Sequence, residues 1–203
     1  MAASRGIFVT VEGLDFSGKS TLVGNLKRLL PEFHFTREPG GSPAAERIRE
    51  LLLDPELEMD SLTEAYLYAA ARADHTRRDI IPHLRSGRGV ICERYLDSSL
   101  AYQGYGRGLG VELVRRLNGF AVGDLRPDVT FYLKLSAAAR ARRTRRRLDR
   151  LEAGGSEFMR RVEAGFEELV KREPDRFRVL DAERPPEELA ALVHREISGL
   201  RRG

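Results

Sequence analysis

The segment GLDFSGKST, residues 13–21, has glycine, lysine and hydroxyl side chains at a spacing that could bind phosphate. Gly13, Gly18, Lys19 and Ser20 satisfy the pattern G-x-x-x-x-G-K-[ST], between an apolar β-branched run and a helical run. In such loops, successive backbone N–H groups and the positive end of a helix hold phosphate oxygens. The lysine reaches the β- and γ-phosphates, and the serine hydroxyl binds Mg²⁺. We expect this segment to bind a nucleoside triphosphate through Gly13, Leu14, Asp15, Phe16, Ser17, Gly18, Lys19, Ser20 and Thr21. The alternative is an ordinary glycine-rich turn.

Phe16 lies inside this loop, between its two fixed glycines. Because a positive φ is costly for phenylalanine, we expect Phe16 to have a negative φ and a side chain that can face away from the ligand. A phenylalanine also supplies no charge. The loop therefore brings no arginine of its own to a transferred phosphate group.

Arginine and tyrosine side chains elsewhere could complete a nucleotide site. Arg37 and Arg94 come at the ends of two predicted strands, and each offers planar donors to a phosphate. Surface salt bridges are the alternative for both arginines. Tyr68 and Arg72 are four residues apart on one predicted helix and so share a face. For this pair, the alternative is a core aromatic residue beside a solvated arginine.

A regular alternation of strands and helices must hold these residues. Strands are predicted at 7–12, 33–36, 89–93, 128–135 and 176–181. Helices are predicted at 20–30, at 43–53 with Ser42 as N-cap, from a Ser61–Glu64 capping box to a bend before Pro82, and at 111–123, 157–171 and 187–200. A further helix is predicted to start at 137, and residues 97–110 are expected to form a polar, glycine-rich loop with a short helix.

This order of elements predicts an α/β fold in which a parallel sheet is covered by helices on both faces. Such sheets bind ligands beyond the carboxyl ends of their strands. The sequence has no internal repeat and no low-complexity linker, so we expect one domain spanning residues 1–203.

Composition and charge disfavour several classes of protein. No apolar run approaches the ~20 residues that span a bilayer. The single cysteine, Cys92, cannot form an internal disulfide, which favours a reducing cytoplasm. Seven arginines lie between Arg140 and Arg150, so the positive formal charge of +4 is local. This favours one anionic ligand or a flexible segment over a surface for nucleic acid. The four histidines show no metal-ligand spacing and are expected to be structural or exposed.

The sequence resembles the thymidylate (dTMP) kinase family over nearly its whole length. The resemblance is carried by VEGLDFSGKST, FTREPGG (35–41), LYAAARADH (67–75), ERYLDSSLAYQGYGRGL (93–109), DLRPDVTFYL (124–133) and LDRLE (148–152). It implies a P-loop NTPase fold with a five-stranded parallel sheet. It also implies transfer of the γ-phosphoryl group of ATP to dTMP, with Mg²⁺, usually by a homodimer.

The resemblance further implies roles for individual residues. Arg37 and Arg94 would hold the acceptor phosphate. Tyr68 would stack on thymine, and Arg72 would hydrogen-bond the edge of the base. The base and sugar pocket would be completed by Ser99, Tyr102 and Gln103, with Tyr102 under the deoxyribose, where it leaves no room for a 2′-hydroxyl.

Two acidic residues also receive roles from the resemblance. Asp15 would contact the 3′-hydroxyl of the sugar, although an acid that caps its own loop is the alternative. Glu93 would help Ser20 to hold Mg²⁺.

The arginine-rich stretch is the candidate mobile lid, around residues 142–156, and its glycines suit a hinge. Because the phosphate loop lacks an arginine, the lid must supply one, as in the bacterial branch of the family. We expect Arg145 and Arg150 to act on the transferred group, with Arg143 and Arg146 behind them. A solvated basic helix face is the alternative. The expected catalytic residues are Lys19, Arg94, Arg145, Arg150 and Asp15.

Four residues depart from the family pattern. Phe16 replaces a usual glycine, Glu93 an aspartate, Ala71 a polar residue and Lys134 a frequent aspartate. Other activities therefore stay open at this point: a kinase for dUMP, UMP or AMP, a nucleic-acid-dependent ATPase, or an inactive relative. A GTPase is disfavoured because no N-K-x-D motif occurs. The expected protein is a cytoplasmic dTMP kinase that binds neither nucleic acid nor membranes.

Overall fold

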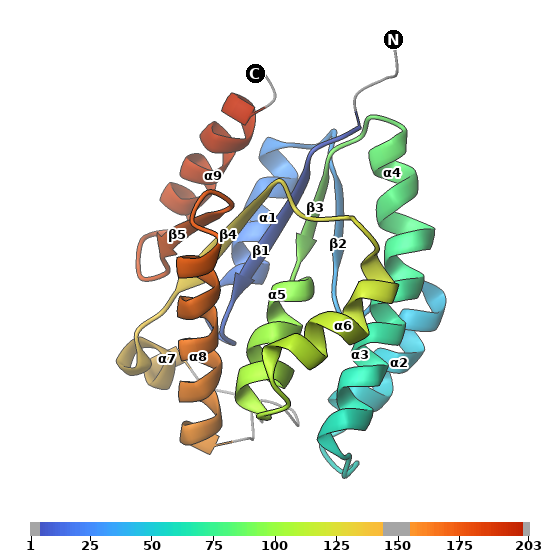
Figure 1. Ribbon diagram of the computed structural model, residues 1–203. Helices are drawn as coiled ribbons and strands as arrows, with labels where there is room; N and C mark the ends of the chain where they lie inside the picture. The colour runs from blue at the N-terminus through green and yellow to red at the C-terminus, as the bar shows by residue number, and fades with distance from the viewer. Residues whose placement is uncertain (1–4, 144–154, 201–203) are drawn as a thin grey trace.

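The fold is built on a five-stranded sheet whose paired strands all run parallel (Figure 1). The computed structural model describes residues 5–143 and 155–200. The strands are β1 (Phe8–Gly13), β2 (His34–Arg37), β3 (Val90–Glu93), β4 (Val129–Lys134) and β5 (Phe177–Asp181), in the spatial order β2-β3-β1-β4-β5. The predicted α/β class, the parallel sheet and the number of strands are confirmed.

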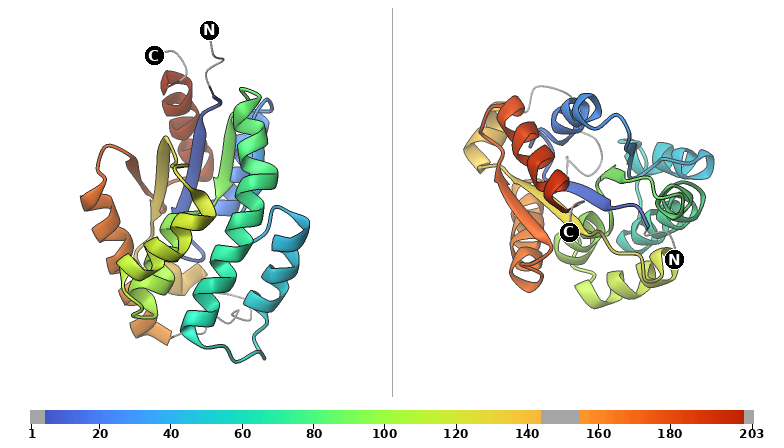
Figure 2. Two further views of the ribbon diagram at one scale, coloured as in Figure 1. Left: turned by 45° about the vertical axis from the view of Figure 1, so that its right-hand side comes forward. Right: turned by 90° about the horizontal axis from the view of Figure 1, so that it is seen from above.

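Helices cover both faces of this sheet, as the view from above makes clear (Figure 2). The helical segments are α1 (Lys19–Leu29), α2 (Pro43–Leu53), α3 (Ser61–His75), the π-helical η1 (Thr76–Ile80), α4 (Ile81–Arg85), α5 (Leu96–Ser99), the π-helical η2 (Leu100–Gly106), α6 (Val111–Val122), α7 (Ala137–Arg143), α8 (Gly155–Arg172) and α9 (Pro186–Leu200). Alternate residues of the central strand β1 face opposite layers. Val9 and Val11 pack with α1 and α9, whereas Phe8 packs with α4 and α6.

The start of α3 differs from the prediction. Asp60, and not Ser61, is the N-cap, and its carboxylate accepts hydrogen bonds from the backbone N–H groups of Leu62 (2.8 Å) and Thr63 (3.3 Å). Glu64 is completely buried and forms an ion pair with Arg107 at 3.0 Å. The predicted capping box is therefore wrong, because Glu64 is buried and has a partly buried cationic partner within reach, which a helix end on the surface cannot match.

The chain continues as a helix through Pro82, where a bend was expected. The π-helical segment η1 precedes it, and the backbone N–H of Ile81 donates to Thr76, five residues earlier. Pro82 then follows in the first turn of α4, directly after the wider π-helical turn.

The segment 97–110, expected to be mainly a loop, is largely helical. It forms the end of α5 and all of η2, and Ala101, Tyr102 and Gln103 are buried. A Cβ atom on Gly106 would lie 2.7 Å from side-chain atoms of Phe158 and Val162. This glycine therefore allows η2 and α8 to pack closely, a reason for glycine that a sequence cannot distinguish from loop flexibility.

Ser42 precedes α2 as predicted, but its hydroxyl makes no cap. It donates instead to Asp74 at 2.6 Å, which joins α2 to α3.

Within the described part of the chain, no helix has both the length and the apolar character needed to cross a membrane.

Candidate functional site

A cavity of about 780 Å³ lies at the carboxyl ends of β1, β2 and β3. Its wall includes the predicted phosphate loop, the ends of β2 and β3, one face of α3 and the α5–η2 segment. Predicted residues from these elements meet there: Asp15, Phe16, Ser17, Gly18, Lys19, Ser20, Thr21, Arg37, Tyr68, Arg72, Glu93, Arg94, Ser99, Tyr102 and Gln103. The edge of the sheet was predicted correctly, because parallel strands direct their carboxyl ends to the same side.

The phosphate loop has the backbone that its motif requires. Gly13 has φ +148°, and a Cβ there would lie 2.8 Å from the Leu133 carbonyl oxygen. Gly18 caps α1 in the left-handed region, so the amino-terminal end of α1 begins at Lys19. The Lys19 Nζ donates to the Leu14 carbonyl oxygen at 2.8 Å and is almost buried. Burial and the nearby Arg94 cation lower the pKa of Lys19 to about 8, so the amine is still mainly charged at neutral pH.

Phe16 has φ +65°, which contradicts the expected negative φ. Its conformation lies in the left-handed region, which costs a non-glycine residue about 1–2 kcal/mol. The side chain is half-buried and lines the cavity. The loop backbone is therefore held in the glycine-like shape that the motif demands, and Phe16 adopts it at a cost in free energy.

A matched pair of substitutions should measure this strain. Phe16→Gly and Phe16→Ala both remove the ring, but only glycine accepts φ +65° freely. We expect the glycine variant to unfold with a free energy about 1 kcal/mol higher than the alanine variant. Urea denaturation of both proteins checks this difference. If the alanine variant were the more stable, as it would be in a helix or strand, the strain at position 16 would be disproved.

Ser20 and Glu93 both line the cavity and contact each other. The Ser20 hydroxyl donates to the Glu93 Oε1 at 2.8 Å, although the two residues are 73 positions apart. A hydroxyl and a carboxylate oxygen are donors suited to Mg²⁺, which prefers oxygen ligands. The longer glutamate side chain thus reaches the serine, so the replacement of the usual aspartate does not separate the pair.

Arg94, Asp15 and Tyr102 form a compact polar cluster beside the loop. Arg94 forms an ion pair with Asp15 and donates to the Gly13 carbonyl oxygen at 3.1 Å, while the Tyr102 hydroxyl donates to Asp15 at 3.0 Å. Burial alone would raise the pKa of Asp15, but the cations of Arg94 and Lys19 outweigh it and lower that pKa. Asp15 is therefore ionised, and the surface salt bridge considered for Arg94 is instead a largely buried one.

Glu12 of β1 supports this cluster, and no pattern in the sequence singled it out. Arg94 itself has φ +65°. The backbone N–H of the next residue, Tyr95, donates to Glu12 at 2.7 Å, and the Ser98 hydroxyl donates to the same carboxylate at 2.6 Å. Burial, and then the charge of Asp97, raise the pKa of Glu12 to about 7. The strained turn at Arg94 is thus anchored to β1.

Arg37 and a further arginine, Arg49, also line the cavity. Arg37 is half-exposed and contacts Glu46 at 3.0 Å. Arg49 lines the cavity from α2 and donates to the Pro39 carbonyl oxygen at 2.7 Å. Burial and the neighbouring Arg37 lower the pKa of Arg49. Sequence reasoning missed Arg49, because helical spacing alone does not show whether Arg47 or Arg49 faces the site.

Tyr68 and Arg72 share a face of α3 and both line the cavity, as their spacing predicted. Arg72 is 2 % exposed, so the alternative of a solvated arginine is wrong. Its guanidinium donates to Glu38 (2.7 Å), Ser99 (2.9 Å), Asn118 and the Tyr95 carbonyl oxygen (3.1 Å). Arg72 is therefore held rigidly.

Gln103 is oriented by a buried carboxylate. Its amide nitrogen donates to Glu64 at 2.8 Å, and its amide oxygen has no partner among the described residues.

Lys134, which departs from the family pattern, binds Glu167 of α8 at 2.6 Å on the surface. Ala71 is buried against the core, where a polar side chain would need a partner.

The cavity extends past the phosphate loop to residues 182–186 and Leu189, a wall that the sequence did not indicate. Arg143 reaches across this end and donates to the carbonyl oxygens of Ala182 (3.0 Å) and Phe16 (3.4 Å). Arg145, Arg146 and Arg150 lie outside the described residues.

Comparison with known proteins places these residues in context. The family model described as thymidylate kinase matches residues 11–193. The chain is 45 % identical to the thymidylate kinase of Deinococcus radiodurans over 201 residues (96 % of this chain and 98 % of that one) and 46 % identical to that of Symbiobacterium thermophilum over 195 residues (93 % and 91 %). A crystal structure of thymidylate kinase from Ehrlichia chaffeensis has a TM-score of 0.76, with 32 % identity, and covers 98 % of this chain and 99 % of that one.

Proposed function

The chain belongs to the thymidylate kinase family, and we propose that the residues around the cavity carry out transfer of the ATP γ-phosphoryl group to dTMP, which gives dTDP and ADP for dTTP synthesis. The family resemblance noted in the sequence is thereby confirmed. One observation carries the assignment of the site: a single cavity joins a phosphate loop to arginines on two other walls. A kinase for UMP, AMP or dUMP and a nucleic-acid-dependent ATPase are not favoured.

The dTMP end of the cavity is assigned to the side nearest α3. Arg37, Arg94 and Arg49 supply guanidinium groups for the acceptor phosphate, and such groups bind phosphate oxygens in pairs. Burial and the charge of Arg37 lower the pKa of Arg49, and a dianion between the two guanidinium groups would relieve their repulsion, which fits this assignment. Tyr68 offers a ring for thymine, and Arg72, Ser99 and Gln103 offer polar groups around the base.

The ATP end is assigned to the phosphate loop and the wall at residues 182–186. Main-chain N–H groups and the amino-terminal end of α1 bind the triphosphate, with Lys19 at the transferred group. Mg²⁺ would be held by Ser20 and Glu93, and when bound it supplies positive charge against the phosphates. Asp15 would receive the sugar 3′-hydroxyl of dTMP, although in the free protein it binds Arg94 and Tyr102.

The reaction needs little beyond position and charge. The acceptor oxygen belongs to a phosphate that is already ionised, so no strong base has to remove a proton. Lys19 and Arg94 stabilise the charge that spreads over the transferred group. Tyr102 is fixed by Asp15 and by edge contacts with the rings of Phe158 and Phe166, so it cannot swing away to admit a 2′-hydroxyl.

ADP release measured with ATP plus dTMP, against ATP alone, tests the function directly. We expect turnover that depends on dTMP, and weak turnover with UMP because of Tyr102. A preference for UMP would contradict the role of Tyr102. Equal ADP release without an acceptor would contradict the kinase assignment.

We also propose that residues 1–203 form a single domain. Within it, the segment around residues 142–156 would act as a mobile lid. Arg143 already bridges the phosphate loop and residue 182, which supports an approach of the following arginines to the same end of the cavity. Closure would exclude water from the phosphoryl group. We expect Arg145→Ala or Arg150→Ala, or both, to lower kcat strongly. Normal turnover in both variants would contradict the lid.

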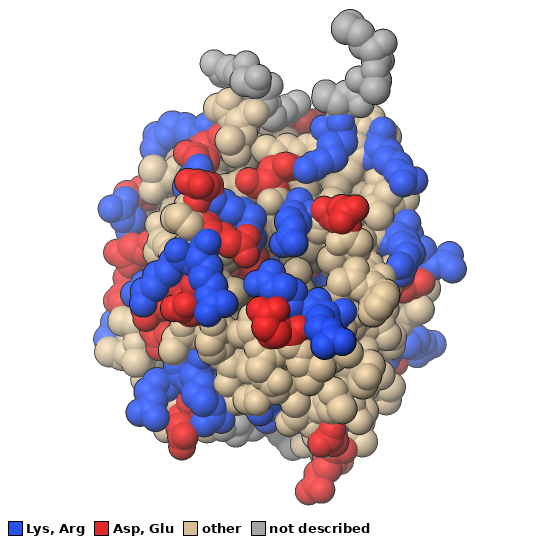
Figure 3. All heavy atoms as spheres, in the orientation of Figure 1, with Lys and Arg blue, Asp and Glu red and all other residues tan. Residues whose placement is uncertain are grey.

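A homodimer in the cytoplasm is the proposed state. Exposed apolar side chains lie on α3 and α6, which pack together: Leu62, Tyr66, Leu113 and Phe120. Figure 3 shows a broad area without charged atoms over the lower part of the face formed by η2, α6 and α3. Phe120, which is 87 % exposed, is the most accessible of these side chains. Such a patch fits a second copy of the chain better than nucleic acid, which requires positive charge.

We expect Phe120→Asp to convert the dimer to a monomer, since a charge would be buried without a partner at the interface. Analytical ultracentrifugation measures the change. Val179→Asp, on the exposed edge strand β5, is the matched control and should leave the dimer intact. Loss of the dimer in both variants, or in neither, would contradict this interface.

A further inference from the structure

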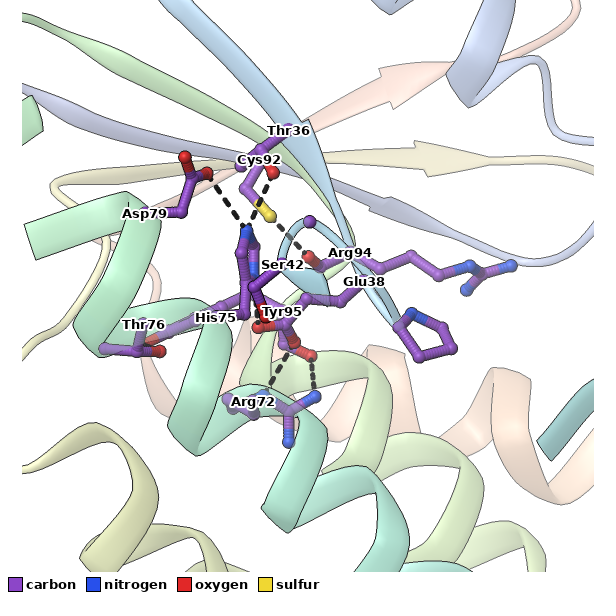
Figure 4. A network of polar contacts seen from close by, with 12 residues as sticks. Thr36, Glu38, Ser42, Arg72, His75, Thr76, Asp79, Cys92, Arg94 and Tyr95 are labelled. Carbon is purple, nitrogen blue, oxygen red and sulfur yellow. Dashed lines mark hydrogen bonds and ion pairs between the residues drawn. The ribbon is translucent and has the colours of Figure 1, made fainter. Parts of the chain in front are cut away.

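A line of alternating charges runs from the cavity wall into the protein (Figure 4). Arg72 donates through Nε to the Glu38 Oε2 at 2.7 Å, and the other oxygen of Glu38 contacts the His75 Nδ1 at 3.1 Å. The His75 Nε2 then lies 2.7 Å from the Thr36 hydroxyl and 3.4 Å from the Asp79 carboxylate. His75 is completely buried, so this imidazole has no contact with solvent.

Both ring nitrogens of His75 face a carboxylate oxygen. A neutral imidazole has one nitrogen without a proton; if this is Nε2, the nitrogen accepts a hydrogen bond from the Thr36 hydroxyl, but the ring then has no positive charge to offer Glu38 or Asp79. The protonated ring donates through Nδ1 to Glu38 and through Nε2 to the Thr36 hydroxyl, and its charge also faces the Asp79 carboxylate at 3.4 Å. Burial alone would lower the pKa of His75, but the hydrogen bonds and charges of Asp79 and Glu38 outweigh it and raise that pKa to about 9. Burial alone would raise the pKa of Asp79, but the hydrogen bonds and charges of His75 and His34 outweigh it and lower that pKa to about 2.

The surroundings of His75 are closely packed. Gly41, which has φ +83°, packs against the ring so closely that a Cβ would collide with the His75 Nε2. Glu38 is only 4 % exposed. If His75 were neutral, Arg72 would be the single cationic partner of Glu38 at hydrogen-bond distance among the described residues. The negative charge of Glu38, at the cavity wall, would then be balanced less completely.

We propose that His75 is a positioning residue for dTMP binding: as a buried imidazolium it holds Glu38, and Glu38 in turn holds the guanidinium of Arg72 at the wall of the cavity. The proposal rests on the proposed function, in which Arg72 contacts thymine. His75 itself touches no substrate. It acts on the affinity for dTMP through Glu38 and leaves the ATP end and the phosphoryl transfer unaffected.

The proposal makes dTMP binding depend on pH in a defined direction. The groups that face or surround His75 come from β2 and the turn after it, from its own helix, from η1 and from the segment after β3: His34, Thr36, Glu38, Arg72, Asp74, Asp79 and Tyr95. Because the pKa of His75 is raised from 6.5 to about 9, its contribution is fully present below about pH 6.5 and is lost as the pH rises through 9. The KM for dTMP should therefore increase between pH 8 and 10.

His75→Gln tests the proposal in the full-length enzyme. At pH 7.5 we expect the KM for dTMP to rise about tenfold, while kcat and the KM for ATP change by less than about twofold. The ratio of variant to wild-type KM should fall toward one between pH 8 and 10. Taking the ratio removes the ionisation of thymine itself, which affects both proteins equally.

His83→Gln is the matched control. His83 stacks on His34 at 3.7 Å, at the outer end of the network, and its contacts do not include Glu38. It should have the wild-type KM for dTMP. If His75→Gln does not fold, Asp79→Asn removes the outer carboxylate, and the rise in KM should then begin at a lower pH than in the wild type.

Arg72→Lys separates this inference from the proposed function. If Arg72→Lys leaves the KM for dTMP unchanged, the assignment of the base site is wrong. If Arg72→Lys raises that KM but His75→Gln lowers only the thermal stability, with a wild-type KM and pH profile, then the positioning role of His75 is overturned while the proposed function stands.

Discussion

Replacement of Lys19 by methionine is expected to lower kcat by about 10³, because a preorganised donor at the transferred group is worth about 10²–10³ and its full charge adds to this. Methionine keeps the unbranched stem, so the buried packing of Lys19 is largely preserved. In the free protein the Nζ rests on the Leu14 carbonyl oxygen. A phosphate oxygen is the stronger acceptor, and we expect the amine to turn to it when ATP binds.

Steady-state kinetics with varied ATP and dTMP measure this effect. Lys27→Met is the matched control, since Lys27 lies on the exposed side of the same helix, over the ring of Phe35. It should keep kcat within about twofold of the wild type. A Lys19→Met enzyme with normal kcat and a raised KM for ATP alone would show that Lys19 binds the triphosphate equally in the ground and transition states.

The second large effect is expected at Arg94. Arg94→Ala should lower kcat/KM for dTMP by about 10²–10³, since it removes a guanidinium that both orients the acceptor phosphate and balances the charge of Asp15. Without Arg94, the pKa of Asp15 should rise, because Arg94 is the larger of the two cationic contributions that lower it. The variant should therefore lose further activity as the pH falls toward the new pKa.

The same kinetic assay, run with dTMP as the varied substrate, measures the loss. Arg116→Ala, at an exposed position of α6, provides the control and should have wild-type values. A loss confined to the KM for ATP would contradict the placement of Arg94 at the acceptor phosphate. Arg94→Ala should have a lower thermal stability than Arg116→Ala, because it leaves Asp15 with fewer partners.

The sheet and the phosphate loop could be predicted because their signals are local. Short β-branched runs alternate with helical patterns, and the glycine and lysine spacing names the loop without any tertiary information. The resemblance to a family added the roles that we propose for the arginines at the acceptor phosphate and for the residues around the base. Both kinds of signal depend on residue types at short spacing, which can be read directly from the sequence.

The misses share a physical cause, which is that a tertiary partner decided the outcome. Glu64 pairs with Arg107 instead of capping α3. Gly106 allows two helices to pack closely, where a flexible loop was expected. Phe16 has the positive φ that the loop imposes. Arg49 and residues 182–186 belong to the cavity because of where their elements dock. None of these facts can be read from spacing along the chain.

The ion pair between Asp15 and Arg94 has one more consequence, for the protein at rest. A guanidinium left open would attract chloride or any other small inorganic anion in the cell. In this structure Asp15 is an internal counter-ion to that guanidinium, so a monovalent salt ion gains little by binding there. A dianionic ligand that also carries a hydroxyl group gains twice, because its phosphate replaces Asp15 at Arg94 and its hydroxyl donates to the displaced carboxylate. The ion pair therefore favours such a ligand over simple inorganic anions.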